Sequence, residues 1–178
     1  MSGLHNREIP TLETERLILR PHREADLADW IAFYASDRAA HVGGFKDRDE
    51  VWRGLVAGLG HWILRGYGMW AVEEKATGLL CGRVGPHCPV DWPEPEIGWL
   101  LLERAEGRGI ALEAALAARR YAYETLGWHT AISLISAANT RSLALAERMG
   151  ARPDGIFHHG RYGEMPIYRH PSPAELAA

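Results

Sequence analysis

Cysteine is scarce and long apolar runs are missing from this chain of 178 residues. The only two cysteines, Cys81 and Cys88, have no second pair with which to complete a zinc site or a disulfide framework. No apolar stretch approaches the ~20 residues that a membrane span requires. Residues 1–10 are polar and contain no signal-peptide core. We therefore expect a reduced, cytoplasmic protein without a membrane partner.

A strong excess of one charge sign is also missing. Lys and Arg number 20 and Asp and Glu number 23, which gives a formal net charge of −3. This balance offers no electrostatic reason to expect nucleic acid as a partner. The length and the ordinary hydrophobic content indicate one domain over residues 1–178, with a core at about 12–170. Both a monomer and a homodimer remain open.

The most informative stretch is Glu96–Ala114. It begins with an apolar run, 97–102, which is short enough to be one buried strand. An alanine- and leucine-rich helix is predicted from Ile110 to about Leu126. The segment therefore predicts a strand, a glycine-containing loop and a helix in direct succession.

The loop of this stretch suits an anionic ligand. Gly107 and Gly109 let the backbone approach a phosphate closely, and the free N–H groups of the following helical turn point at it. Arg104 and Arg108 add positive charge. A P-loop is excluded because no Lys-Ser or Lys-Thr follows the second glycine, and the three-glycine spacing of a dinucleotide fingerprint is missing.

The remaining periodicities predict an α+β fold, because several strands follow one another with few helices between them. A capping-box pattern, Asp47 followed by Glu50, opens a helix that Gly54 and Gly58 weaken by roughly 1 kcal/mol each. These glycines indicate either close packing or a mobile helix. We predict strands at 16–20, 69–74, 79–84, 129–136, 151–158 and 164–170, further helices at 24–35 and 140–149, a loop at 85–95 and a disordered tail from 171.

Two motifs resemble the GNAT acetyltransferases. Arg104-Ala-Glu-Gly107-Arg-Gly109 matches their Arg/Gln-x-x-Gly-x-Gly/Ala signature. Asn139-Thr-Arg-Ser142, followed by Glu147-Arg-Met-Gly150, resembles the branch that acetylates N-terminal amines, the ribosomal-protein alanine and serine acetyltransferases. The segment Thr14–Pro21 is similar to the first strand of that branch. The resemblance covers about residues 12–170.

This resemblance implies the GNAT fold, a mixed and mostly antiparallel sheet of about six to seven strands with about four helices and a V-shaped splay at the cofactor site. It also implies acetyl-CoA as cofactor, with the pyrophosphate on the loop and the pantetheine arm along the strand edge, where a backbone N–H polarises the thioester. The acceptor is expected to be a small-molecule amine or a protein N-terminus. The cofactor-binding residues are then Trp99, Leu100, Leu101, Arg104, Gly107, Arg108, Gly109, Ile110, Ala111 and Asn139.

Acetyl transfer to an amine needs a base and a proton donor for the thiolate. Glu96, at the start of the strand, is the first candidate for the base, with His87 as the alternative and Glu94 just upstream. Glu96 could equally orient the amine or be an exposed strand end. Many GNAT enzymes carry a donor tyrosine where this chain has Ala146, so Ser142 is the candidate for the contact with the thiol.

The histidines near the end of the chain do not predict a metal site. Because adjacent strand residues point to opposite faces, His158 and His159 do not readily share a metal ion with His170, and we expect no metal. Walls of the acceptor pocket are predicted from a late loop and from the first helix, namely Arg161, Tyr162 and Glu164 together with Trp30, Phe33 and Tyr34.

Two other functions remain open beside an acetyl-CoA-dependent N-acetyltransferase. One is a CoA-binding module of the same fold without transferase activity, which the Ala146 departure favours. The other is a different nucleotide-binding protein that uses the glycine loop.

Overall fold

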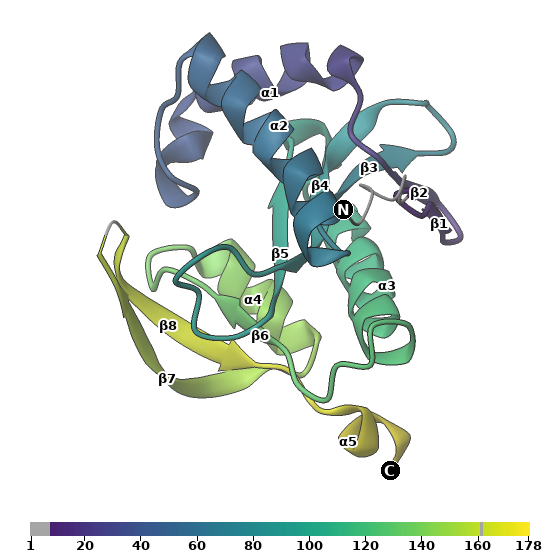
Figure 1. The fold of residues 1–178 in the computed structure, drawn as a ribbon, viewed down its shortest axis with the longest axis vertical. Helices are drawn as coiled ribbons and strands as arrows, with labels where there is room; N and C mark the ends of the chain where they lie inside the picture. The colour runs from purple at the N-terminus through teal and green to yellow at the C-terminus, as the bar shows by residue number, and fades with distance from the viewer. Residues whose placement is uncertain (1–7, 161) are drawn as a thin grey trace, which may run out of the picture.

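An eight-stranded sheet organises the molecule in the computed structural model, which describes residues 8–160 and 162–178 (Figure 1). The spatial order is β1-β2-β3-β4-β5-β6-β8-β7, and every neighbouring pair is antiparallel except β5 and β6. The strands are β1 (Leu12–Glu13), β2 (Leu17–Arg20), β3 (Trp70–Glu74), β4 (Leu80–His87), β5 (Glu96–Leu101), β6 (Ile132–Leu134), β7 (Arg152–His159) and β8 (Gly163–Arg169).

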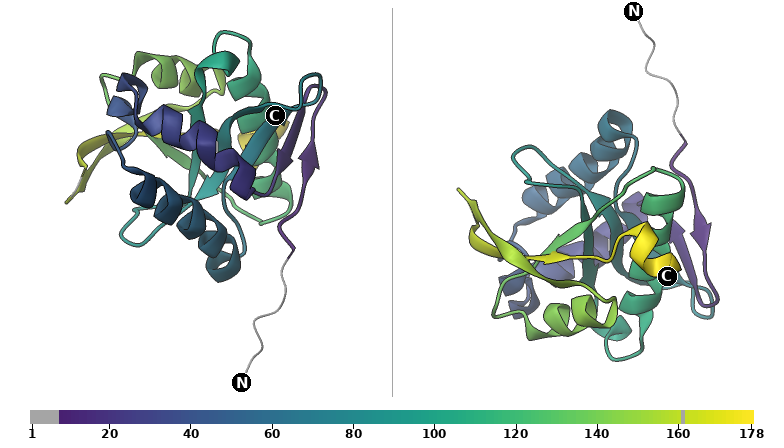
Figure 2. Two further views of the ribbon diagram at one scale, coloured as in Figure 1. Left: turned by 90° about the horizontal axis from the view of Figure 1, so that it is seen from above. Right: turned by 90° about the horizontal axis from the view of Figure 1, so that it is seen from below.

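The helices cover both faces of this sheet. They are α1 (Leu27–Tyr34), α2 (Arg48–Arg65), α3 (Ile110–Glu124), α4 (Thr140–Arg148) and α5 (Pro173–Ala177), with short 3-10 turns η1 (Glu24–Asp26), η2 (Asp37–His41) and η3 (Glu103–Ala105). The views from above and below place α1 and α2 at one end of the molecule and α5 at the other (Figure 2). The predicted α+β class with a mixed, mostly antiparallel sheet is confirmed, with eight strands instead of six to seven.

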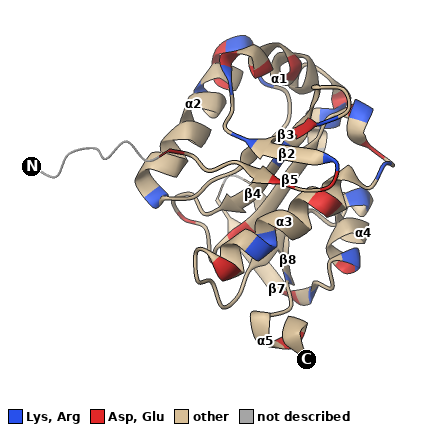
Figure 3. Ribbon diagram, turned by 90° about the vertical axis from the view of Figure 1, so that its right-hand side faces the viewer, with Lys and Arg blue, Asp and Glu red and all other residues tan. Residues whose placement is uncertain are grey.

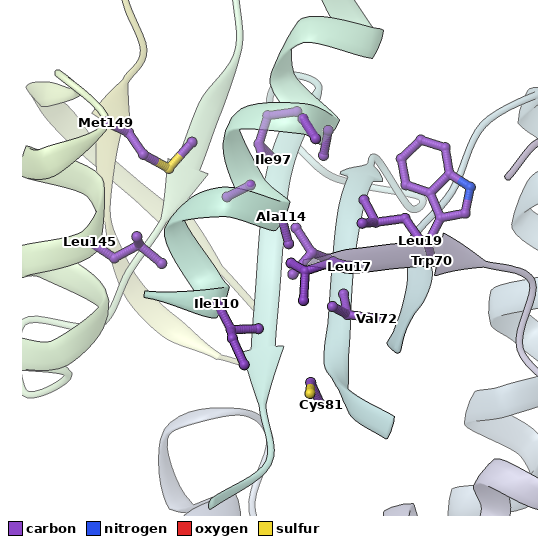
Figure 4. Close-up of a cluster of buried hydrophobic side chains, with 14 of the residues drawn as sticks. Leu17, Leu19, Trp70, Val72, Cys81, Ile97, Ile110, Ala114, Leu145 and Met149 are labelled. Carbon is purple, nitrogen blue, oxygen red and sulfur yellow. The ribbon is translucent and has the colours of Figure 1, made fainter. Parts of the chain in front are cut away.

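The core lies between α3 and the central strands (Figure 4). Side chains of β2 and β3 such as Leu19 and Trp70 pack there with Ile97 of β5 and Ile110 of α3. Small residues of α3, including Ala114 and Ala118, are fully buried. Small side chains let the helix lie close to the sheet, and this sets the position of the loop that precedes it.

Two predictions were wrong. Residues 85–87 are not loop, because β4 continues to His87 and pairs with β5 from Gly82 to His87. Pro86 is tolerated there because the pairing with β3 ends at Val84, so that this part of β4 is paired on one side only. The tail from residue 171 is ordered and forms α5, where Ser172 and Glu175 make a capping box with proline in the first turn.

The one parallel pair of strands separates almost immediately. β5 and β6 are in register only at Glu96 and Ile132, where the Ile132 N–H donates to the Pro95 carbonyl at 3.1 Å. The Ser133 hydroxyl donates to the Ile97 carbonyl at 2.7 Å and adds a side-chain link at the same point. Beyond this link the two strands diverge, which is the predicted splay.

The exterior carries charges of both signs. In Figure 3, Lys and Arg are interspersed with Asp and Glu over the face shown. Among the residues that the structure describes, no helix is long and apolar enough to cross a membrane.

Candidate active site

A groove of about 950 Å³ lies at the splay of β5 and β6. Its walls come from β5, from the loop before α3, and from the first turns of α3 and α4, which lie on either side of β5 in Figure 1. Eight of the sequence-predicted site residues line it, namely Trp99, Leu100, Leu101, Gly107, Gly109, Ala111, Asn139 and Ser142. Segments 40 residues apart in the sequence therefore meet in one groove.

The N-terminus of α3 forms one end of the groove. Gly107 and Gly109 have φ angles of 70° and 76°, a left-handed conformation that favours glycine. Gly109 is the N-cap of α3 and brings no side chain to cap the first-turn N–H groups. Those donors and the positive end of a 15-residue helix suit an anion such as a pyrophosphate.

The glycine loop is held in place by the first strand. The Glu113 carboxylate of α3 accepts hydrogen bonds from the Thr14 hydroxyl at 2.5 Å and the Arg16 N–H at 2.9 Å. The Arg16 guanidinium in turn donates to the Arg108 carbonyl at 2.9 Å. This contact gives the Thr14–Pro21 segment a role that the sequence did not reveal, which is to fix the loop backbone.

The two arginines predicted to bind the cofactor at the loop, Arg104 and Arg108, point away from the groove. Arg104 forms an ion pair with Asp29 and Arg108 one with Glu74. Neither lines the groove, and Ile110 is buried in the core.

Three other arginines line the groove instead, and sequence reasoning missed them: Arg38, Arg141 and Arg148. Arg38 and Arg141 both contact Glu106, and the buried Arg38 Nε has no hydrogen-bond partner among the described residues. Arg141 lies in the Asn139–Ser142 part of the second motif and Arg148 in its Glu147–Gly150 part. The motif was therefore the sequence signal that could have identified these two arginines as groove residues.

Alternate residues of β5 present their backbone N–H and C=O groups to the groove. The Ile97 carbonyl points toward β6, whereas the Leu102 N–H bonds β4 at 2.8 Å. Because backbone groups alternate along a strand, Trp99 and Leu101 present their N–H and C=O groups to the open edge. Leu100 presents its own toward β4.

Ser142 and Asn139 lie at the start of α4. The Asn139 side chain accepts from the Ser142 N–H at 3.2 Å and so caps the helix. The Trp99 indole N–H donates to the Ser142 hydroxyl at 3.1 Å. Because the hydroxyl is the acceptor in that bond, its own proton is free to be donated into the groove. Ala146 is fully buried against Ile135.

Glu96 is a buried carboxylate at the base of the splay, with only 8% of its surface exposed. It accepts from the Trp92 indole at 2.5 Å and from the Leu134 N–H at 3.3 Å. Burial outweighs these two hydrogen bonds and raises the pKa of Glu96 to about 7. The group can therefore gain and lose a proton near neutral pH.

The other two candidate bases have different environments. Glu94 makes two hydrogen bonds to Arg169, at 2.7 and 2.8 Å, and these lower its pKa. His87 lies opposite Glu96 in the β4–β5 register, and burial lowers its pKa to about 3. A general base works best with a pKa near the working pH, which favours Glu96.

A second cavity of about 270 Å³ lies between α1, α2 and the adjoining strands. Trp30 and Tyr34, predicted as an acceptor wall, line it together with His87, whereas Phe33 lines the groove. Of the other predicted wall residues, Tyr162 packs near Trp92 with ring centroids 6.2 Å apart and Glu164 is exposed beside His158. Arg161 lies outside the described residues.

The histidines considered for a metal are spread over the fold. His158 is exposed, and His170 is buried with its Nε2 2.9 Å from the Ser133 hydroxyl. Across residues 8–160 and 162–178, no group of three or more His, Cys, Asp or Glu side chains is arranged to hold a metal ion.

Comparison with known proteins identifies the family of this chain. Residues 16–152 match the family described as an acetyltransferase (GNAT) domain. The chain belongs to this family and is an N-acetyltransferase; GNAT domains in general use acetyl-CoA as a co-substrate.

Similar proteins are found both by sequence and by structure. A crystal structure of an acetyltransferase from Agrobacterium tumefaciens str. C58 is 39% identical, with a TM-score of 0.85 over 93% of this chain and 96% of that chain. The protein YkkB of Bacillus subtilis (strain 168) is 31% identical over 148 residues, 78% of this chain and 83% of that protein. The ribosomal L7/L12 α-N-protein acetyltransferase RimL shares the fold at 15% identity, with a TM-score of 0.74 over 90% of this chain and 93% of that chain.

Proposed function

We propose that this protein transfers an acetyl group from acetyl-CoA directly to a primary amine. The observation that carries the proposal is the position of Glu96, a buried carboxylate with a pKa of about 7, at the base of the β5–β6 splay beside a groove that ends at the uncapped N-terminus of α3. Acetyl-CoA would supply the acetyl group as a thioester, whose carbon–sulfur bond breaks as the amide bond forms.

The groove residues fit acetyl-CoA. The first-turn N–H groups of α3 and the backbone of Gly107–Gly109 would hold the pyrophosphate, and Arg141 and Arg148 add positive charge to the same groove. The open edge of β5 at Trp99 and Leu101 would pair with the pantetheine amides, as an added strand does. The N–H groups on that edge are the donors for the thioester carbonyl oxygen.

Two side chains would carry the proton transfers. Glu96, when ionised, accepts a proton from the attacking amine, directly or through a water molecule. Ser142 contacts the sulfur and offers it a proton, because its hydroxyl oxygen already accepts the Trp99 N–H. When the acceptor starts as an ammonium ion, the products are the amide, CoA with a protonated thiol and one released proton, so the reaction balances.

The acceptor class stays broad in this proposal. The Asn139–Gly150 motif favours a peptide or ribosomal-protein N-terminus, and the fold shared with RimL is compatible with it. Small amines fit the same chemistry, since the fold and the cofactor site do not determine the acceptor.

The test combines binding with turnover. We expect CoA to raise the melting temperature, and at least one member of a panel of amines and peptides to release CoA thiol in the presence of acetyl-CoA. A chain that binds CoA but acetylates nothing in the panel would be a binding module instead. Competition by ATP or NAD with no effect of CoA would indicate a different nucleotide site.

A further inference from the structure

Two donor nitrogens without a hydrogen-bond partner among the described residues belong to residues that line the second cavity. They are Trp30 Nε1 and Arg83 Nε, whereas the Nδ1 of a third lining residue, His22, lies 3.8 Å from Asp26 Oδ2. A buried donor without a partner costs roughly 1–3 kcal/mol. Two such donors on residues of one cavity favour a ligand that carries acceptor atoms.

Arg83 is the centre of this group. It is half-buried on β4, and its Nη2 donates to the Tyr34 hydroxyl at 2.9 Å. Its guanidinium carbon lies 5.5 Å from the centre of the Trp30 ring. These two contacts hold the guanidinium in one orientation, with the Nε edge unused. A fixed guanidinium edge matches a carboxylate, which can accept two parallel hydrogen bonds from it.

The charge balance of the cavity favours an anion. No carboxylate of the described residues forms an ion pair with Arg83 or with Lys46, whose ammonium lies 4.2 Å from the centre of the Tyr34 ring. The nearby Asp26 is already bonded to Arg20 at 2.8 and 2.9 Å. Glu50, the acidic residue of the lining, accepts from the Asp47 N–H in the cap of α2.

Two residues of the cavity lining, Met69 and His87, are neighbours of Glu96. The Met69 methyl carbon and Glu96 Oε1 lie 3.2 and 3.8 Å from the point that a Cβ at Gly98 would occupy. His87 is the cross-strand neighbour of Glu96. The end of the cavity at Met69 and His87 is therefore the end nearest the carboxylate.

The two glycines that weaken α2, Gly54 and Gly58, also line this cavity. A Cβ at either would meet no atom within 4 Å. The glycines therefore do not serve close packing; they leave space. The cost in helix stability, roughly 1 kcal/mol each, coincides with room for a ligand.

We infer that this cavity binds the acceptor, and that the acceptor is a small primary amine carrying a carboxylate that Arg83 holds while the amine reaches Glu96. The inference rests on the proposed function and narrows its acceptor. Arg83 is in this view the residue that sets specificity, whereas Glu96 performs the proton transfer.

The first experiment compares acceptors in matched pairs. A series of ω-amino acids of increasing chain length is measured against the alkylamines of the same length that lack the carboxylate, by release of CoA thiol. We expect kcat/KM to be roughly 10- to 100-fold higher for the best amino acid than for its alkylamine, the range of hydrogen bonds to a charged group. Equal values within every pair would overturn the inference, and so would a preference for aminoalkyl phosphates.

The second experiment removes or replaces the guanidinium of Arg83. Arg83→Gln should remove the preference, so that kcat/KM for the amino acid falls to the value for its alkylamine. Arg83→Lys, which keeps the charge without the planar fork, should retain part of it. Arg65→Gln is the matched control, because Arg65 is an exposed cation of α2 outside the cavity lining. Equal loss with both acceptors in Arg83→Gln and Arg83→Lys would contradict the assignment.

A third measurement separates this inference from the proposed function. Calorimetry of the CoA complex with the best ω-amino acid and its alkylamine detects binding even if no acetyl group is transferred. Gly58→Leu should fill the cavity and abolish that binding, whereas Gly60→Leu, on the same helix but outside the lining, should leave it intact. Binding without turnover would refute the transferase; turnover of alkylamines without carboxylate binding would refute only the role of Arg83.

Discussion

The groove lies along β5 and the second cavity lies beside β4, and the two present different kinds of groups to a ligand. The groove presents backbone groups at Gly107, Gly109 and the open edge of β5, and two of its arginines share a carboxylate, Glu106. The second cavity presents rings and cations, and Arg83 there has no acidic partner among the described residues. Backbone recognition tolerates many side chains, whereas the second cavity depends on each side chain it contains.

This difference matches the two proposed ligands. A cofactor shared by a whole family can be held by N–H groups that any sequence supplies, provided that glycine permits the loop. An acceptor that differs between enzymes must be recognised by side chains that differ too. Glu96 stands between the two sites and belongs to neither lining.

Glu96→Gln should have the largest effect, because it removes the base that serves both ligands. We expect kcat/KM to fall roughly 10²- to 10⁴-fold, the usual worth of general acid–base catalysis, with CoA affinity unchanged. Glu94→Gln is the control, since Glu94 is held by Arg169. If the two variants lose the same activity, Glu96 is not the base.

The pH profile gives an independent check of the same residue. The pKa of Glu96 is raised to about 7, so the carboxyl is protonated and inactive as a base below that pH and ionised above it. In the wild-type enzyme, kcat/KM should therefore rise about tenfold per pH unit below 7 and level off above it. A wild-type profile that is flat between pH 5 and 8 would contradict this role.

Gly107→Val should affect the groove and spare the second cavity. Forcing a side chain into the left-handed region costs about 1–2 kcal/mol, so a loop that keeps its shape less often should bind CoA roughly 5- to 30-fold more weakly. Gly127→Val is a matched control, because Gly127 has the same φ of 70° and no atom within 4 Å of an added Cβ. Calorimetry should show weaker CoA binding only for Gly107→Val.

Ser142→Ala should have the smallest effect. Loss of one hydrogen bond of about 0.5–1.5 kcal/mol corresponds to a two- to tenfold lower kcat, with the Kd for CoA nearly unchanged. Trp99→Phe removes the indole donor but keeps the hydroxyl, so it should lower kcat less. Full activity in stopped-flow measurements of Ser142→Ala would remove Ser142 from the chemistry.

Much of the fold was predictable because its signals are local. The capping box at Asp47 and the alanine- and leucine-rich helix from Ile110 were predicted from the sequence and are present in the structure. The continuation of β4 to His87 was not, because it depends on pairing with β5. The capping box at Ser172 was a local signal that was overlooked.

The predicted site residues divide in the same way. The glycine loop and Asn139 follow motifs, so their sequence spacing placed them in one groove. Arg104 and Arg108 lie in the same motif, but the motif does not determine where their side chains point. A long flexible side chain pairs with whichever carboxylate the fold brings near, and here these are Asp29 and Glu74. Arg83 drew no attention in the sequence, since its significance is the absence of an acidic neighbour in the described structure.

By itself, then, the sequence determined the family, the order of the elements and the loop that suits acetyl-CoA, because each depends on residues adjacent in the chain. Only the tertiary structure decided which cations remain unpaired, that the pKa of Glu96 lies near 7 and that a second cavity is lined by His87, the cross-strand neighbour of Glu96. Burial and charge pairing depend on contacts between distant segments, and these exist only after the chain has folded.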